Sequence, residues 1–177
     1  PDADRFPRSV IGHPDEGWDN SWWLDIRQIS VLEPIMQARI EECRAKGFDA
    51  VEPDEIDGYS NDSGFPLTAA DQLAYNRAVA SWVHEAGLSV GLKGGIDQAA
   101  DLVSSFDWTL NEECFRYDEC DLLNVFVNAD KAVWIAEYRV ADLTTQDCAA
   151  ATRNRWNAAR YELGLPVDGG RQPCGGW

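Results

Sequence analysis

Hydrophobic and polar positions repeat with two different periods along this chain. Short apolar runs at 88–93, 106–111 and 131–138 have the length and composition of buried strands. Segments 31–45 and 68–87, by contrast, carry apolar residues at every third or fourth position, which is typical of amphipathic helices. Because strand and helix alternate along the chain, we predict an α/β protein with a parallel sheet.

The remaining elements follow from local signals. Residues 1–21 are expected to be irregular, because three prolines lie among them. Gly47 is the expected left-handed residue after the first helix, and Thr68 with Asp71 predicts a capping box at the start of the second. Further strands are predicted at 22–27, 50–51 and 159–165. A short helix is predicted to end near residue 104, and two more helices are predicted at 117–128 and 144–151.

An acidic stretch follows the short strand at 50–51. Its members are Glu52, Asp54, Glu55 and Asp57. No basic residue lies among them, so the carboxylates repel one another. Such a cluster is unfavourable unless a cation, a cationic substrate or a catalytic step makes use of it. The alternative is a solvated acidic loop.

Several predicted strands end in residues that can carry chemistry. These are Asp54, Lys93, Glu112 and Glu137. Such strand ends are the pattern of the catalytic rim of a (β/α)8 barrel, although an open doubly wound sheet also places its site there. We expect residues 1–177 to form a single TIM-barrel type domain that is incomplete, with about five C-terminal βα units present and about three N-terminal strands missing.

Two carboxylates at the ends of neighbouring strands are the machinery of glycoside hydrolysis. One protonates the leaving oxygen, and the other attacks the sugar carbon or activates water. Asp54 and Glu112 fit this arrangement best, since each comes directly at the end of a different strand. They could instead cap helices or pair with a base such as Lys93. Glu113 is the rival of Glu112, because side chains alternate along a strand and only one of the two points inward easily.

Other residues near the strand ends are candidates for substrate contact. Asp57 and Tyr59 would lie on a loop and could bind sugar hydroxyls or amines, unless the Asp57-Gly58 pair is only a turn. Tyr138 is expected to pack, and Trp108 is expected in the core. The candidates for stacking on sugar rings are Trp18, Trp22 and Trp23.

The composition limits the class of partner. The chain has 177 residues, with 31 acids, 15 bases and a formal net charge of -16. This charge argues against nucleic acid and anionic membranes as partners, and it favours cationic ones. No apolar run approaches the ~20 residues that span a bilayer. Without a nucleotide fingerprint or a calcium-loop spacing, neither a cofactor nor a metal is predicted; a divalent-metal-dependent hydrolase using residues 52–57 is a weaker alternative.

The cysteines bear on the compartment. There are five, so one is left over if disulfides form. Two local disulfides, with Cys43 unpaired in a helix, would indicate a secreted protein. Five reduced thiols are the alternative. A zinc site is not expected, because there is no CxxC pair and only two histidines are present.

Seven ordered motifs run through the chain. They are WLDIR at 23–27, IMQAR at 35–39, GFDAVEPD at 47–54, GFPLTAADQLAYN at 64–76, GLK at 91–93, NEECF at 111–115 and AEY at 136–138. Together they resemble glycoside hydrolase family 114, the endo-α-1,4-polygalactosaminidases, which have a TIM-barrel fold. The resemblance extends from Pro1 to Cys174.

The resemblance implies hydrolysis of α-1,4-linked galactosamine in a secreted, polycationic exopolysaccharide. It assigns catalysis to Asp54 and Glu112, with Glu112 as nucleophile and Asp54 as acid/base if the mechanism is retaining. The residues that it places at the substrate rim are Asp57, Tyr59, Lys93 and Glu137. The disulfides that it implies are Cys114–Cys120 and Cys148–Cys174.

Two positions depart from the family pattern. Asn commonly follows Glu-Pro-Asp and Gly-Leu-Lys in the family, whereas Glu55 and Gly94 stand there in this chain. Both lie beside the predicted site. These departures and the incomplete barrel leave a second interpretation, a catalytically inactive carbohydrate-binding barrel fragment.

Overall fold

The computed structural model describes residues 2–139, 143–166 and 169–175. The chain divides within β4 into two compact units, Pro1–Val90 and Gly91–Trp177, here called unit 1 and unit 2. Each unit combines parallel strands with helices, as the alternation of apolar periods predicts.

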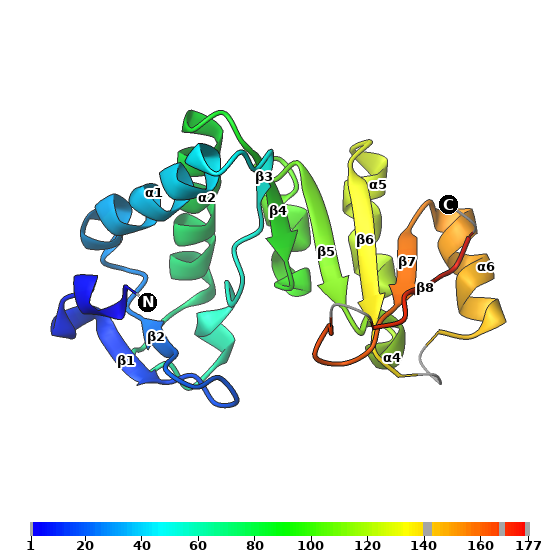
Figure 1. The fold of residues 1–177 in the computed structure, drawn as a ribbon, viewed down its shortest axis with the longest axis horizontal. Helices are drawn as coiled ribbons and strands as arrows, with labels where there is room; N and C mark the ends of the chain where they lie inside the picture. The colour runs from blue at the N-terminus through cyan, green and yellow to red at the C-terminus, as the bar shows by residue number, and fades with distance from the viewer. Residues whose placement is uncertain (1, 140–142, 167–168, 176–177) are drawn as a thin grey trace. The chain divides into compact units, whose positions relative to one another are not determined.

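Unit 1 contains a small hairpin, which follows two short 3-10 helices, and then two long α-helices (Figure 1). Its elements are η1 (Ala3–Arg5), η2 (Arg8–Val10), β1 (Ile11–Pro14), β2 (Trp22–Leu24), α1 (Ile29–Ala45), β3 (Ala50–Val51), η3 (Gly58–Ser60), α2 (Ala69–Glu85) and the start of β4 (Ser89–Lys93). Strands β3 and β4 are parallel, with Ala50 opposite Ser89. Strands β1 and β2 are antiparallel. The prediction that residues 1–21 are irregular is therefore wrong for β1, whose extended residues gain ladder hydrogen bonds from a distant segment.

The two long helices begin and end where the sequence predicts. Gly47 has φ 85°, and the N–H of Phe48 reaches the carbonyl of Cys43 at 3.2 Å, which completes a Schellman motif after α1. At the start of α2, the hydroxyl of Thr68 accepts from the N–H of Asp71 at 3.2 Å. The carboxylate of Asp71 accepts from the N–H of Thr68 at 2.9 Å. The predicted capping box is confirmed.

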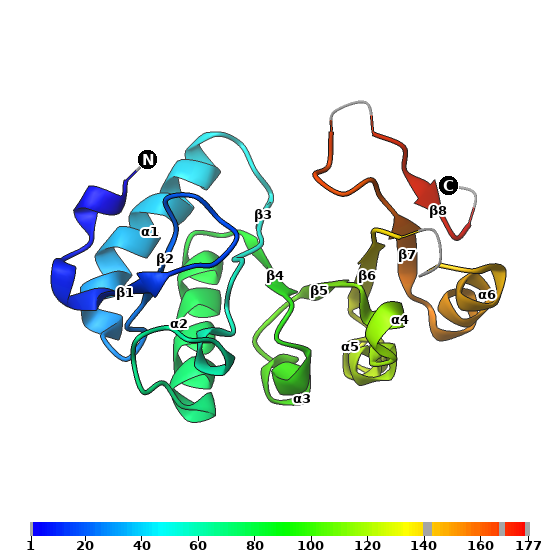
Figure 2. The ribbon, with the colours of Figure 1, turned by 90° about the horizontal axis from the view of Figure 1, so that it is seen from below.

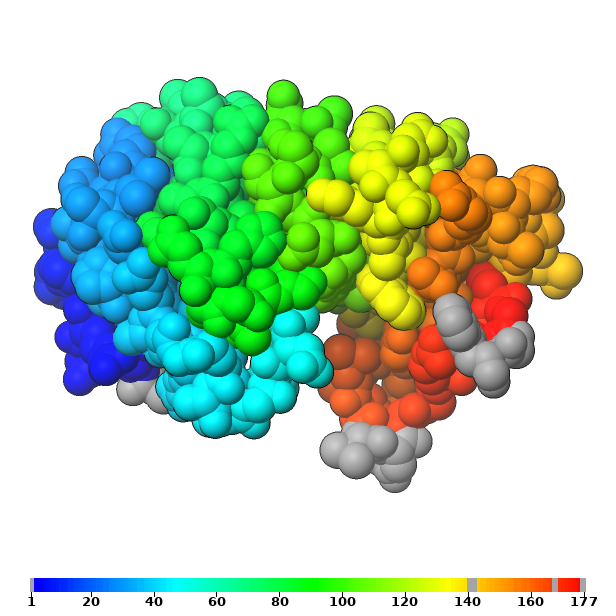
Figure 3. All heavy atoms as spheres, turned by 90° about the horizontal axis from the view of Figure 1, so that it is seen from above, coloured from blue at the N-terminus to red at the C-terminus, as the bar shows by residue number. Residues whose placement is uncertain are grey.

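The N-terminal segment is fastened to α1. Both carboxylate oxygens of Asp2 accept from the guanidinium of Arg39, at 2.8 and 2.6 Å. The same guanidinium lies 4.9 Å from the ring centroid of Phe6, within the range of a cation–π contact. Figure 3 shows these first residues, in dark blue, against the lighter blue of α1.

Unit 2 is built on parallel strands in the order β4, β5, β6, β7, with β8 antiparallel to β7. Figure 2 shows α3, α4 and α5 on one side of β5 and β6. Its elements after β4 are η4 (Ile96–Gln98), α3 (Ala99–Leu102), β5 (Trp108–Glu112), α4 (Cys114–Tyr117), η5 (Cys120–Leu123), α5 (Asn124–Asn128), β6 (Ala132–Glu137), α6 (Thr145–Asn154), β7 (Asn157–Arg160) and β8 (Gln172–Pro173).

Two predicted elements of unit 2 differ from the structure, and a third element was not predicted. The helix predicted at 117–128 is divided among α4, η5 and α5, because Asp118 adopts φ 56° and ends α4. The strand predicted at 159–165 begins earlier and stops at Arg160. Strand β8 is absent from the sequence prediction, since its two residues, Gln172 and Pro173, are exposed and give no apolar signal.

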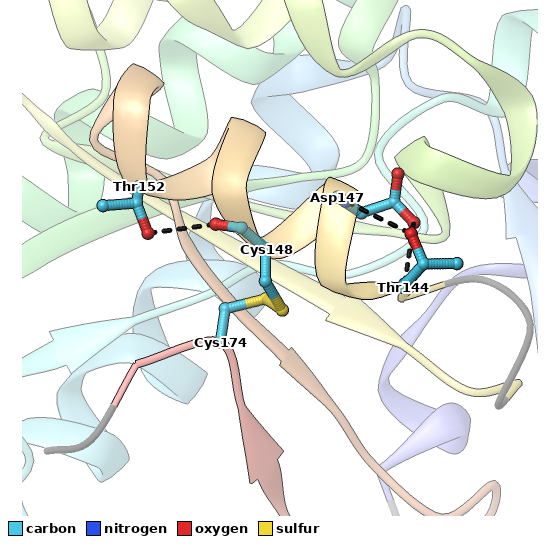
Figure 4. Close-up of a disulfide and its surroundings, with 5 residues drawn as sticks. All are labelled: Thr144, Asp147, Cys148, Thr152 and Cys174. Carbon is cyan, nitrogen blue, oxygen red and sulfur yellow. Dashed lines mark hydrogen bonds between the residues drawn. A yellow bond between two sulfur atoms is a disulfide. The ribbon is translucent and has the colours of Figure 1, made fainter.

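Both disulfides implied by the family resemblance are present. The Cys114–Cys120 disulfide links the first residue of α4 to a cysteine six residues later in the sequence. Cys148–Cys174 joins α6 to the segment after β8, across a separation of 26 residues (Figure 4). Thr144 and Asp147 form a second capping box at the start of α6, whose first turn contains Cys148. Cys43 carries a free thiol, as predicted.

No helix in the described part of the chain is both long and apolar enough to cross a bilayer. Within that part the parallel strands are β3 to β7, where a closed barrel has eight. The assignment of residues 1–177 to a single domain stays a prediction.

Candidate active site

Asp54 lies just beyond β3, on the wall of a pocket in unit 1. The pocket has a volume of about 370 Å³, and Trp22 and Trp23 also line it. The side chain of Asp54 is exposed, and its Oδ1 accepts from the N–H of Glu55 at 3.0 Å. The third tryptophan proposed for sugar stacking, Trp18, does not line this pocket. Trp22 and Trp23 therefore share this pocket with Asp54, whereas Trp18 does not.

A buried amide pair on α2 holds the loop after Asp54. The Nδ2 of Asn76 donates to the carbonyl of Ile56 at 3.0 Å, and the Nε2 of Gln72 donates to Asn76 Oδ1 at 2.8 Å. The Oε1 of Gln72 in turn accepts from the N–H of Tyr59 at 3.3 Å. Both amides are buried, where unmade hydrogen bonds are costly. Their role was missed from the sequence, because amides on an amphipathic helix give no sign of the loop they meet.

Asp57 and Tyr59 are half-buried on this loop. The Oδ1 of Asp57 accepts from the amide of Asn61 at 3.3 Å, and its carbonyl accepts from the hydroxyl of Ser60 at 2.8 Å. These local bonds belong to a turn. They leave the predicted contact of Asp57 and Tyr59 with substrate as a prediction.

Both departures from the family pattern fall on left-handed backbone. Glu55 has φ 54° and Gly94 has φ 59°. Asn is the residue besides glycine that most readily adopts this conformation. Glu55 therefore adopts the conformation against a steric cost, whereas Gly94 does not.

Glu112 is held by two donors in unit 2. It is the last residue of β5, and its Oε2 lies 3.0 Å from the ammonium of Lys93, at the end of β4. The hydroxyl of Tyr138 donates to Glu112 Oε1. The Glu112 side chain is 39% exposed and that of Lys93 only 12%. The structure thus brings Lys93 and Glu112 together as strand-end residues, and it adds Tyr138, for which the sequence predicts only packing.

Glu113, the rival carboxylate, has a different partner. It adopts φ 60°, and its Oε1 accepts from Arg116 at 2.7 Å. Because the strand ends at Glu112, the left-handed turn directs the two neighbouring acids to different bases.

Glu137 is fully buried at the end of β6. Its Oε1 accepts from the N–H of Phe115, in α4, at 2.9 Å. The N–H of Glu113 reaches the carbonyl of Ala136 at 2.8 Å, so the end of β6 is bonded both to α4 and to the residue that follows β5. Contact of Glu137 with substrate stays a prediction.

Neither histidine lines the pocket that Asp54 lines. His84 is exposed on α2, and His13 pairs with Asp62 at 3.2 Å. Among residues 2–139, 143–166 and 169–175, no group of three or more His, Cys, Asp or Glu side chains has the arrangement to hold a metal ion.

Comparison with known families matches the model of glycoside hydrolase family 114 to residues 1–174. The chain belongs to glycoside hydrolase family 114. It is a glycoside hydrolase with a fold of the (β/α)8 TIM-barrel type. A search of curated proteins finds no significant match.

Solved structures agree with the family assignment. Ega3 of Aspergillus fumigatus, in a complex with galactosamine, is 32% identical and superposes with a TM-score of 0.81. The match covers 93% of this chain and 70% of Ega3. The glycoside hydrolase domain of PelA from Pseudomonas aeruginosa is 15% identical, with a TM-score of 0.62 over 94% of this chain and 72% of that one. A point variant of PelA is 16% identical, with a TM-score of 0.63 over 95% and 74%. The PelA likeness shows the fold alone.

Proposed function

We propose that this family 114 glycoside hydrolase cleaves α-1,4-linked galactosamine polymers at internal linkages, with Asp54 and Glu112 as its catalytic carboxylates. The observation that carries the proposal is the setting of Glu112. A carboxylate at a strand end, with an ammonium on one oxygen and a phenol on the other, is held in one orientation before the reaction begins.

In the proposed mechanism Glu112 is the nucleophile. One of its oxygens attacks the anomeric carbon as the glycosidic bond breaks, and a glycosyl–enzyme ester forms. Asp54 gives its proton to the leaving oxygen, and then takes a proton from the water that hydrolyses the ester. The exposed position of Asp54 supports this role, because water must reach it in the second step.

The proposed substrate is supported by the net charge of the chain and by its similarity to Ega3. Ega3, which is 32% identical to this chain over the matched region, is in a complex with galactosamine in its solved structure. Free amines make such a polymer polycationic near neutral pH, and a net charge of -16 attracts it. We expect kcat/KM to fall as salt is raised, because salt screens that attraction. Activity independent of ionic strength would contradict this part of the proposal.

Substrate binding is assigned to residues near the two carboxylates. These are Asp57, Tyr59 and Lys93, together with the pocket tryptophans Trp22 and Trp23. Glu137 is fully buried and supports the end of β6 instead. The two disulfides support a secreted location, because disulfides persist in oxidising compartments.

Glu112→Gln and Asp54→Asn test the proposal on galactosamine polymer, with reducing ends counted over time. Each is expected to lower kcat by about 10²- to 10⁴-fold, whereas the affinity for the polymer should be retained. Glu113→Gln is the matched control, because Glu113 pairs with Arg116 instead, and it should stay near the wild-type rate. Chain-length analysis of early products tests internal cleavage.

Three results would count against the proposal. Retained turnover in Glu112→Gln would remove Glu112 from the reaction. Early release of monomer alone would contradict internal cleavage. Polymer binding by the wild type without any turnover would instead support a carbohydrate-binding barrel.

A further inference from the structure

We propose that Tyr138 is a positioning residue for Glu112, an inference that rests on the proposed function of Glu112. The phenol holds one carboxylate oxygen while Lys93 holds the other. The nucleophile is thereby kept in a single orientation before the sugar arrives.

The register of the sheet explains the contact. Glu112 on β5 lies opposite Ala136 on β6. Side chains alternate between the faces of a strand, so Tyr138, two residues after Ala136, returns to the face that Glu112 occupies. Its hydroxyl meets Glu112 Oε1 there.

The intervening residue anchors the strand end. Glu137 points to the opposite face, where its buried carboxylate accepts the N–H of Phe115 at 2.9 Å. The bond from the N–H of Glu113 to the carbonyl of Ala136 fixes the same junction. Tyr138 therefore projects from a backbone that is tied on its other side to the turn after Glu112.

The chemical consequence concerns the oxygens of Glu112. With donors on both, the carboxylate has little freedom to rotate about its terminal bond. When one oxygen attacks the sugar, its donor must move aside, while the other oxygen keeps its hydrogen bond as it becomes the carbonyl of the ester. The proton of Tyr138 stays on the phenol throughout, so Tyr138 is not an acid or base in the reaction.

Tyr138→Phe tests this role, with Tyr117→Phe as the matched control. The control removes a hydroxyl from an exposed tyrosine of the same unit. On galactosamine polymer, Tyr138→Phe is expected to lower kcat by about 10-fold or more, the scale of a misplaced reacting group. KM should stay within about twofold and the thermal midpoint should be unchanged, because only orientation is lost. Tyr117→Phe should match the wild type.

A double-mutant cycle with Glu112→Gln separates the possibilities. If Tyr138 acts through Glu112, Tyr138→Phe adds no further loss in the Glu112→Gln background. A further loss there, or a wild-type kcat in Tyr138→Phe alone, would overturn the inference while leaving Glu112 in place. Full turnover by Glu112→Gln would overturn the proposed function as well.

Discussion

Gly91 on β4 and Trp108 on β5 are register partners, and the indole fills the place where a side chain on Gly91 would be. A Cβ at this glycine would overlap the six-membered ring of Trp108. Trp108 itself is only half-buried. In the Gly91-Leu92-Lys93 motif, packing against Trp108 thus requires glycine at the first position, and the third position supplies a residue of the candidate site.

Gly91→Ala is expected to destabilise unit 2. The added methyl must displace the ring or the backbone, which typically costs about 1–3 kcal/mol in a packed region. Urea denaturation followed by tryptophan fluorescence measures the change. Gly170→Ala is the control, because a Cβ there meets nothing within 4 Å. Equal stability of the two variants would show that the indole of Trp108 can move aside without a loss in the free energy of unfolding.

Glu55→Asn is expected to stabilise the protein. Glu55 has φ 54°, and a left-handed conformation costs a residue with a long side chain more than it costs Asn. We expect a gain of about 0.5–1 kcal/mol in the free energy of unfolding. Glu16→Asn, at an exposed position outside the left-handed region, makes the same change of charge and should show no comparable gain. A gain of equal size in both variants would assign it to reduced acidic repulsion.

Trp22→Ala is expected to weaken substrate binding. Trp22 is 40% exposed and lines the pocket beside Asp54. An indole face that meets a protonated amino sugar contributes about 0.5–2 kcal/mol, which corresponds to a rise in KM of about 2- to 30-fold. Trp18→Ala removes an indole that is 65% exposed and outside the pocket, so its KM should stay near the wild-type value. A larger rise in KM for Trp18→Ala than for Trp22→Ala would indicate that the substrate binds at Trp18 instead.

The Asp25–Arg27 pair is expected to stabilise unit 1 above acidic pH. Two hydrogen bonds from Arg27, at 2.7 and 3.0 Å, lower the pKa of buried Asp25 below its usual 3.8. A lowered carboxyl pKa gives stability that is complete above 3.8 and is lost as pH falls through the native value. Arg27 is exposed, so solvent screens the pair and Asp25→Asn should cost no more than about 1 kcal/mol at neutral pH. The difference from wild type should vanish in strong acid, whereas the exposed Asp19→Asn should show no such pattern.

Loss of the Cys148–Cys174 disulfide is expected to cost more than loss of a free thiol. Closing a loop of 26 residues stabilises by about 3–4 kcal/mol in the chain-entropy model. The double variant Cys148→Ser with Cys174→Ser should therefore unfold at lower urea concentration. Cys43→Ser alters a thiol without a bond and serves as the control. Equal midpoints would indicate that the reduced chain keeps the tail against α6.

The order of the elements could be predicted from the sequence because it depends on local signals. Apolar periodicity predicts α1, α2, β4 and β6, and capping chemistry fixes their ends at Gly47 and Thr68. Elements without such signals were missed or misplaced. The hairpin strand β1 and the short β8 exist only because other segments pair with them.

The candidate site was also predictable only in part. Strand-end position alone singled out Asp54, Lys93, Glu112 and Glu137, and the family motifs agreed with that choice. The partners of these residues could not be predicted, because they come from distant parts of the chain. Tyr138 reaches Glu112 through the β5–β6 register, and Asn76 reaches the loop after Asp54 through helix packing.

The sequence by itself determined which residues can do chemistry, since residue type and local period suffice for that. Only the tertiary structure decided how Glu112 and Glu113 differ. One pairs with Lys93 and Tyr138, and the other turns away to Arg116, because a left-handed residue at the end of β5 sends two adjacent side chains in different directions.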